Sequence, residues 1–517
     1  HQELYPSRFI SLITPLIELP DLPSVAMSFY KNDRQDYKKA LTYFNQISSP
    51  SYDKLLDKAE IFIHLKKYNQ AEKILREIEQ QEEFPALHPT AQLLLGQLNE
   101  DRYTFHEALT WYKKFLSYND NRQYHMRVVK LLQEMLQWED AYSYLFNIAS
   151  KRNLSYDEEI EYIRCLTFTS RFDKAKEQAK ALIKHKEALT PLHKIHLAEA
   201  MLISHNNEIF TMLMDNIENI SLKEKEKHSL IKLYVSMGEY SQAQKVTSTL
   251  KDAITDGDAL LSQARLNMYL NNKEKALDLA RYAFETSPYN YSLSIFLLYN
   301  DEDLKAQKQY ASRFYQDFEN TPSHALAELG MLRHEIAMIQ QEKSRGTVSE
   351  IEYSQRLYDM QATLQSLADR NHSFPEVFAL LGKVLLLSEN RESSEHALLL
   401  AIQDYPSYTE AHKALASLYT SLDKPYKAID HIAKALRFSY NDAESWIQLS
   451  ILFLETDNRE RSSKALEKAR RFTPADSSLA EQLDALSDRL LLPQQEDISQ
   501  EEKTDSGDIL SALREMV

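Results

Sequence analysis

The stretch AHKALASLYTSLDKPYKAIDHIAKALRF, residues 411–438, decides the fold of this chain. Small side chains, among them Ala416 and Ala428, stand at regular intervals between leucine, isoleucine and tyrosine residues. A small side chain at a helix interface lets two helices approach each other closely. The stretch therefore predicts two helices packed as a hairpin, and its recurrence elsewhere would make it a repeat.

The pattern recurs at a spacing of 34 residues. Phe378, His412 and Trp446 are equivalent positions, each 34 residues from the next. Four places later the first helix carries a small residue, which is Gly382, Ala416 or Ser450, and sixteen places later the second helix carries Ser394, Ala428 or Ser462. A helix-turn-helix unit of this length and pattern resembles the tetratricopeptide repeat (TPR).

The resemblance extends over about twelve units, roughly residues 24 to 474. The small residue of the second helix recurs along the chain at Ala40, Ala71, Ala108, Ala141, Ala175, Ala243, Ala276 and Ala311. The family implies an all-α fold, an α-solenoid in which helix-turn-helix repeats form a right-handed superhelix. Only 7 glycines in 517 residues also argue against strands joined by tight turns and against phosphate-binding loops.

The expected organisation has two arrays and several flanking segments. An N-terminal array covers 24–322, and a C-terminal array of three regular repeats covers 375–474. The predicted units of the first array are 24–50, 52–82, 89–119, 122–150, 156–186, 189–219, 224–251, 257–288 and 292–322. The flanking segments are an N-terminal capping segment (1–23), an irregular unit of long helices (323–372), a capping helix (476–491), an acidic disordered linker (493–507) and a short amphipathic tail helix (508–517).

Composition excludes several functions. The net charge of −16 disfavours binding to nucleic acid or to anionic membranes. No apolar run approaches the ~18 residues of a membrane-spanning helix. The single cysteine, Cys165, excludes a disulfide framework within one chain and reads as a small buried hydrophobic residue.

A search for chemistry finds no catalytic constellation, since HExxH, GxSxG, P-loop and CxxC motifs are all missing. His193 and His196 lie three residues apart on a predicted helix, but a metal site needs further ligands. We therefore expect no enzyme activity, no catalytic residues, no cofactor and no metal ion.

One position of the first helix suggests a binding surface. The residue five places after the aromatic position points into the concave groove of a TPR superhelix, as the resemblance implies. It is basic in five units, as Lys130, Arg164, Lys232, Arg265 and Lys383, which we call the basic ladder. The ladder predicts a groove for an acidic peptide or helix of a partner protein. The alternative is that these side chains are merely exposed and pair with neighbouring glutamates.

The family's carboxylate clamp is not carried over to this chain. Lys413 stands at a matching inner position, but Ser417 stands where the clamp needs asparagine. The sequence therefore does not predict binding of chaperone C-termini.

The C-terminal tail is a second candidate for partner binding. Ile509, Leu510, Leu513, Met516 and Val517 fall on one face of a short helix that follows the acidic linker. Two alternatives remain open: the tail is a frayed terminus, or the linker folds back and occludes the basic ladder.

These features favour a non-catalytic scaffold or adaptor that binds other proteins and has no nucleic-acid or membrane-inserting activity. Two alternatives are a peptide- or ligand-sensing regulator and an accessory arm of an enzyme whose catalytic part lies outside this chain. The scarcity of cysteine favours a bacterial protein of the periplasm or cell envelope over a cytoplasmic one. The chain begins with His rather than Met, so we expect that a signal or anchor upstream was removed. The oligomeric state is left open.

Overall fold

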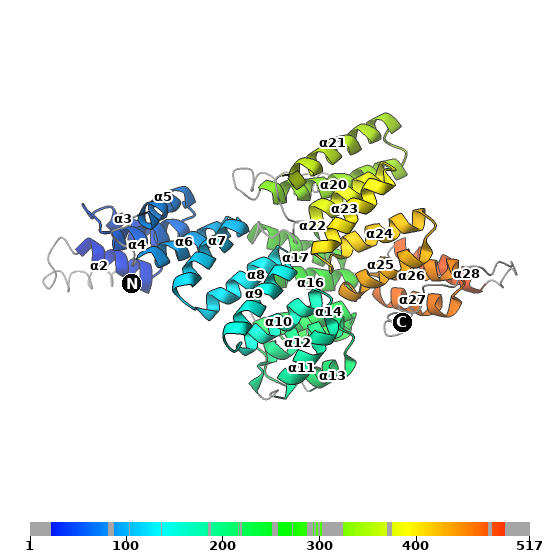
Figure 1. The fold of residues 1–517 in the computed structure, drawn as a ribbon, viewed down its shortest axis with the longest axis horizontal. Helices are drawn as coiled ribbons and strands as arrows, with labels where there is room; N and C mark the ends of the chain where they lie inside the picture. Colours follow the sequence, from blue (N-terminus) through cyan, green and yellow to red (C-terminus); the bar gives the residue numbers. More distant parts are fainter. Residues whose placement is uncertain are drawn as a thin grey trace. The chain divides into compact units, whose positions relative to one another are not determined.

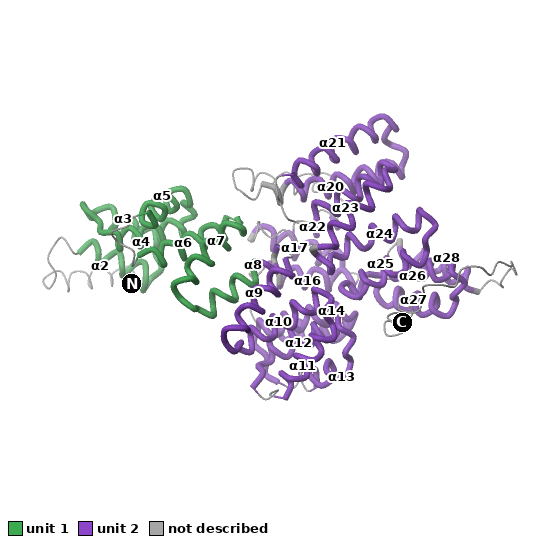
Figure 2. The backbone as a smooth tube through the Cα atoms, in the orientation of Figure 1, with its two compact units in different colours: residues 1–131, 321–323 green, residues 132–320, 324–517 purple. Residues whose placement is uncertain are grey.

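A computed structural model shows an all-helical chain (Figure 1). It describes residues 22–491 except 81–86, 103, 136, 185–187, 216, 218–219, 251–256, 271, 287–292, 294–295, 298–299, 302–323, 370–374 and 474–477. Within this part of the chain there is no β-strand. The chain divides into two compact units, and the boundary after Leu131 falls inside helix α8 (Figure 2).

The helices alternate as the first and second helix of successive hairpins, here named helix A and helix B. The first compact unit holds α2 (Leu22–Ser28), the short π-helix η3 (Phe29–Asp33), α3 (Tyr37–Phe44), α4 (Tyr52–His64), α5 (Tyr68–Glu79), α6 (His88–Asp101), α7 (Phe105–Tyr118) and most of α8 (Arg122–Glu134).

The second unit begins with helices that we call the central array. They are α9 (Trp138–Lys151), α10 (Tyr156–Phe168), α11 (Phe172–Ile183), α12 (Pro191–Ile203), α13 (Asn207–Met214), α14 (Glu224–Met237), α15 (Tyr240–Thr247), α16 (Gly257–Tyr269) and α17 (Lys273–Thr286).

The rest of the second unit starts with a pair of longer helices, α20 (His324–Ser344) and α21 (Glu350–Asp369). The C-terminal array follows as α22 (Pro375–Leu387), α23 (Arg391–Asp404), α24 (Thr409–Ser421), α25 (Pro425–Phe438), α26 (Ala443–Glu455) and α27 (Arg459–Phe472). Finally, α28 (Ser478–Leu491) packs against α26 and α27 with Leu483 and Leu486 buried, at the place predicted for a capping helix. The N-terminal segment, most of unit 292–322, the linker and the tail lie outside the described residues.

The small residue of helix A permits the close contact within each hairpin. A Cβ atom added to Gly382 would lie 2.5 Å from Cγ of Leu398, which is sixteen residues further on. The same spacing joins Gly96 to Tyr112, where the added Cβ would lie 2.6 Å from the ring. Any larger side chain at these positions would push the two helices apart, so the repeat depends on small residues there.

Two serines replace alanine on helix B and bond across the same interface. The hydroxyl of Ser394 donates to the carbonyl oxygen of Gly382 at 2.7 Å, and that of Ser462 donates to the carbonyl oxygen of Ser450 at 2.8 Å. Both serines are fully buried. Because each hydroxyl has a partner, the substitution leaves no unsatisfied polar group in the core.

The turn inside each hairpin uses residues other than glycine in the left-handed region. Lys66, Ser170, His205, Glu389, Asp423 and Asp457 all have positive φ, between 52° and 62°. Each is followed by an N–H that bonds back to a carbonyl five residues earlier, as Asn390 does to Leu385 at 2.9 Å. Left-handed backbone costs most residues about 1 kcal/mol, and only Gly238 among the hairpin turns avoids this cost.

We therefore expect Glu389→Gly to stabilise the α22–α23 hairpin by up to about 1 kcal/mol, because it removes the strain at φ +62°. Amide hydrogen exchange in α22 and α23 measures this locally. Glu389→Ala is the matched control, since it removes the same side chain and keeps the strain. Equal protection in both variants would contradict the prediction.

A pair of buried histidines lies in the core of the C-terminal array. Nδ1 of His412 lies 2.9 Å from Nδ1 of His431, and Nε2 of His412 donates to the carbonyl oxygen of Pro406 at 2.9 Å. The ring of Tyr419 stacks on His431. Burial lowers the pKa of each histidine to about 4, because neither ring is solvated well enough to carry a proton.

This pair predicts acid sensitivity of the C-terminal array. The unfolded chain takes up protons near pH 6.5 and the folded chain only near pH 4, so stability is complete above about 6.5 and falls as the pH drops toward 4. His431→Asn is expected to flatten this pH dependence, measured by hydrogen exchange of α24 and α25 at pH 7 and pH 5. The exposed His396→Asn serves as the control and should leave the slope unchanged.

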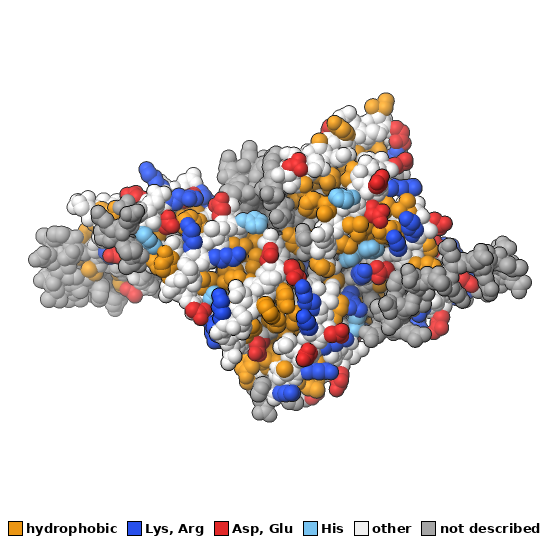
Figure 3. Space-filling model, in the orientation of Figure 1, with side chains coloured by type: hydrophobic (Ala, Val, Ile, Leu, Met, Phe, Trp, Pro, Cys, Tyr) orange, Lys and Arg blue, Asp and Glu red, His pale blue; other side chains and the backbone are white. Residues whose placement is uncertain are grey.

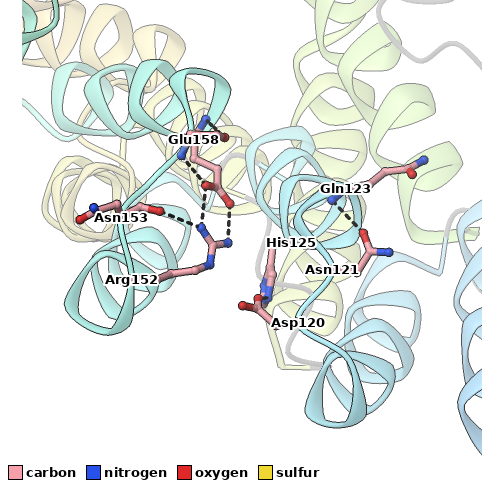
Figure 4. A network of polar contacts seen from close by, with 8 residues as sticks. Asp120, Asn121, Gln123, His125, Arg152, Asn153 and Glu158 are labelled. Carbon is pink, nitrogen blue, oxygen red and sulfur yellow. Dashed lines mark hydrogen bonds and ion pairs between the residues drawn. The ribbon is translucent and has the colours of Figure 1, made fainter.

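Helix α10 begins at a buried ion pair (Figure 4). Ser155 caps the helix: its hydroxyl accepts from the Glu158 amide at 3.4 Å, and its own amide donates to the Glu158 carboxylate at 2.7 Å. Arg152 donates two hydrogen bonds to the same carboxylate, at 2.6 and 2.8 Å. Burial alone would raise the pKa of Glu158, but Arg152 and the Ser155 amide outweigh it and hold the pKa at about 2. The connection from α9 to α10 is thereby fixed in one direction.

Candidate functional site

Charged side chains on successive A helices form two networks within the second compact unit. The central network consists of Gln133, Glu161, Arg164, Glu199 and Lys232, on α8, α10, α12 and α14. The C-terminal network consists of Arg333, Glu376, Lys383, Glu410, Lys413 and Asp442, on α20, α22 and α24 and at the N-terminal end of α26. The family resemblance places the A helices on the concave side of the solenoid.

The central network alternates acid and base. Arg164 donates to both oxygens of the Glu161 carboxylate, at 3.0 and 2.8 Å, and lies 3.6 Å from Glu199. Glu199 also pairs with Lys232 at 3.4 Å. Burial alone would raise the pKa of Glu199, but the charges of Lys232 and Arg164 lower it to about 2. Two cations thus share one carboxylate across three helices.

Within this network the positions of the side chains decide what a partner can reach. Lys232 is 61% exposed, whereas Arg164 is 17% exposed and its Nε has no hydrogen-bond partner. His196 lies in the same environment, and burial together with the charge of Arg164 lowers its pKa to about 4. The buried Cys165 contacts Gln133, and burial raises the pKa of its thiol to about 12. Only the Lys232 end of this network is open to solvent.

The C-terminal network repeats the alternation with different residues. Arg333 pairs with Glu376 at 3.0 Å and with Glu410 at 3.9 Å. Lys413 pairs with Glu410 at 3.4 Å and with Asp442 at 2.9 Å. Burial alone would lower the pKa of Lys413, but these two carboxylates raise it.

Lys383 differs from its neighbours in this network. It is half-buried, and burial lowers the pKa of its amine, while the positive charges of Arg333 and Lys413 lower it further against the opposing charge of Glu410. Lys383 is therefore a cation held between two others on the neighbouring A helices. A carboxylate from a partner would relieve that repulsion.

The structure distributes the five residues of the predicted basic ladder over different surroundings. Arg164 and Lys232 share Glu199 and so show the pairing with glutamate that the sequence left as the alternative. Lys130 on α8 and Arg265 on α16 are exposed. Lys383 belongs to the C-terminal network. The five predicted tail residues lie outside the described part of the chain.

Sequence reasoning missed the acidic half of both networks. Glu161 precedes Arg164 by three residues, and Glu410 precedes Lys413 by three, a spacing that places both side chains on one helix face. That spacing was the available signal. The contacts to Glu199, Asp442 and Glu376 come from neighbouring helices, so no local pattern predicts them.

Neither the histidines of α12 nor other groups suggest a metal centre. His193 caps its own helix, with Nδ1 accepting from the Thr190 amide at 3.3 Å, and its Nε2 lies 2.8 Å from Asp157. Over the described ranges, three or more potential metal ligands gather nowhere. None of the helices in those ranges combines the length and the apolar character that crossing a bilayer requires.

The face drawn in Figure 3 shows the same mixture on the surface. Basic and acidic side chains are interspersed over the described helices instead of being separated into large regions of one sign. A partner surface that fits such a pattern must itself carry both charges or compete with the ion pairs already present.

With this geometry described, the chain is an α-solenoid of TPR-type helical hairpins, a class of helical-repeat protein. No protein-family model matches it. The Arabidopsis thaliana "Protein CTR9 homolog" is 24% identical over 230 residues, which are 43% of this chain and 20% of that protein. The match thus spans about one fifth of that relative's length.

Solved structures with similar folds include the APC/C hetero-tetramer Cut9–Hcn1, which has 15% identity, covers 93% of this chain and 92% of that one, and has a TM-score of 0.38. A tetratricopeptide repeat protein from Parabacteroides merdae has 15% identity, covers 51% of this chain and 98% of that one, and has a TM-score of 0.35. The fold assignment itself rests on the repeat period and hairpin contacts of this chain.

The buried arginine pair should matter more for stability than an exposed one of equal geometry. We expect Glu161→Gln to destabilise α10 and α12 by about 2–3 kcal/mol, because Arg164 loses its bidentate partner in a buried setting. Hydrogen exchange of those helices measures the effect.

The matched control is Glu139→Gln. Glu139 accepts two bonds from Arg171 at 2.7 Å but is 48% exposed, so its loss should cost less than about 1 kcal/mol. Equal effects of the two substitutions would show that the central network does not stabilise the array.

Proposed function

We propose that this chain is a non-catalytic scaffold that binds segments of partner proteins along the A-helix face of its repeats. The observation that carries the proposal is the repetition of partly compensated charges on successive A helices, with Lys232 and Lys383 at the points where a partner's carboxylates can enter. A solenoid presents such positions at regular spacing on an extended surface.

The partner of this surface is an acidic peptide or helix of another protein. Its carboxylates would pair with Lys130, Lys232, Arg265 and Lys383 and compete with Glu199 and Glu410 for Arg164 and Lys413. Such exchange of one carboxylate for another gives specificity and fast association more than high affinity. The proposal therefore expects binding that weakens as salt concentration rises.

We further propose that the protein acts as a subunit of a bacterial multi-protein assembly in the periplasm or cell envelope. The use of one cysteine in 517 residues supports this compartment. Fractionation of the producing cells tests it, and recovery in the cytoplasmic fraction alone would reject it.

The binding test compares two triple variants of equal net charge in a pull-down read by mass spectrometry. Lys130→Glu, Lys232→Glu and Arg265→Glu reverse three exposed A-helix cations. Lys174→Glu, Lys180→Glu and Lys245→Glu reverse three exposed lysines on the B helices α11 and α15. Arg164 is left intact because reversing a buried ion pair would damage the fold.

We expect the A-helix variant to lose at least about tenfold of the captured partner, as three charge reversals at an interface typically cause, while the B-helix variant keeps it. If both variants capture the same proteins in the same amounts, the A-helix face is not the binding surface. If both lose them equally, net charge alone explains binding and the proposal also fails.

A further inference from the structure

The hairpin turns of the central array form a surface that the C-terminal array contacts. In a simple solenoid each repeat contacts only its neighbours. Here the turn between α14 and α15 and the turn between α10 and α11 meet residues of α25, α27 and the loop after α25. The partners are up to 232 residues apart in sequence. We call this contact the turn-edge interface.

One end of the interface lies at the α14–α15 turn. The side-chain amide of Asn441 donates to the carbonyl oxygen of Val235 at 3.3 Å and to the hydroxyl of Tyr269 at 3.2 Å. Arg471 pairs with Glu239 at 2.5 Å. Since both members of this ion pair are substantially exposed, it contributes little to the closed state.

The tightest contact at this end involves Gly238. It caps α14 with φ +72°, and a Cβ atom added to it would lie 2.3 Å from the ring of Phe472. Phe472 is the last residue of α27 and belongs to the C-terminal core. Glycine at this position is thus required twice, by the backbone conformation and by the approach of the C-terminal array.

The other end of the interface is aromatic. Phe438, at the end of α25, stacks on Phe168 at the end of α10, with ring centroids 5.8 Å apart. The guanidinium of Arg437 lies 4.3 Å from the ring centroid of Phe172, the first residue of α11. The charge of Arg437 also acts on His205, in the intervening α12–α13 turn. Three successive hairpin turns therefore face the C-terminal array.

The two hydrophobic cores remain separate at this interface. One cluster of buried residues lies within α10–α16 and another within α22–α28. Tyr240 is the one described residue that packs against both, and it is only partly buried. The arrays are joined by surface contacts instead of a shared core, so they can separate without unfolding.

Two buried polar atoms at this interface lack hydrogen-bond partners. The hydroxyl of Tyr240 and Nε2 of His205 are both closed to solvent without a partner among the described residues. A buried donor or acceptor without a partner is unfavourable, and water would satisfy both atoms once the arrays part. The closed arrangement thus contains a built-in opposition to its own contacts.

We propose that the turn-edge interface is a releasable latch, in which the C-terminal array is the intramolecular partner of the central hairpin turns. The latch has a closed state, as in this structure, and an open state in which the central turns and the α25–α26 loop are free. Opening changes the relation between the central and C-terminal networks, and it thereby couples partner binding on one array to the accessibility of the other.

The test measures the distance between the arrays by pulsed electron spin resonance. Nitroxide labels are attached to cysteines introduced at Lys245 on α15 and Lys464 on α27, both exposed. The native Cys165 is fully buried, so it does not compete for the label. The unsubstituted, doubly labelled chain is expected to show one main distance.

The decisive variant is Gly238→Ala, with Gly346→Ala as its matched control. Gly346 has φ +67° and nothing within 4 Å of an added Cβ, so its substitution introduces the backbone strain without the clash. We expect Gly238→Ala to lower the ratio of closed to open molecules about tenfold and Gly346→Ala to leave it unchanged.

Two further variants separate attraction from opposition. Asn441→Ala, which removes both hydrogen bonds, should open the latch, and Tyr240→Phe, which removes the unsatisfied hydroxyl, should close it about tenfold more tightly. The proposal is overturned if Gly238→Ala and Asn441→Ala keep the native distances, if Gly346→Ala opens the arrays as Gly238→Ala does, or if Tyr240→Phe opens them.

Discussion

The close approach of helices A and B within each hairpin is the constraint on which the rest of the structure depends. At Gly96 and Gly382 the opposing side chain occupies the space that a Cβ atom would need. Because this contact sets the distance and orientation of the two helices, it also determines which face of helix A stays free to carry charged residues. The period of 34 residues, the free A-helix face and the position of the hairpin turns all follow from it.

Different sides of the repeats then perform different tasks. The A-helix face carries the two charged networks, in which carboxylates such as Glu199 and Glu410 each serve cations from two helices. The hairpin turns carry the contact between arrays, through Gly238 and the aromatic pair Phe168 and Phe438. Binding on the A-helix face and movement at the turns can therefore be altered by separate substitutions, because they share no residue.

Much of the fold was predictable because hairpin packing is a local property. The small residue of helix A, the helix ends and the long helices of 323–372 all leave a signal in a short window of sequence. The candidate site was predictable only in part. The basic ladder named Arg164 and Lys232, but their shared partner Glu199 lies on α12, one helical hairpin away from each of them, and the pattern of basic residues alone hid it.

The sequence by itself determined the all-helical hairpin repeat, since every 34-residue unit carries its own packing instructions in small and large side chains. It also placed cations at one register of helix A. Only the tertiary structure decided which cations are neutralised and that the C-terminal array contacts the central turns, through Asn441 and Phe472. These contacts join residues up to 232 positions apart, and they form only when the stacked repeats bring those surfaces together. No periodic pattern contains that information, because the residues involved stand at turns and helix ends, where the repeat imposes least on side-chain identity.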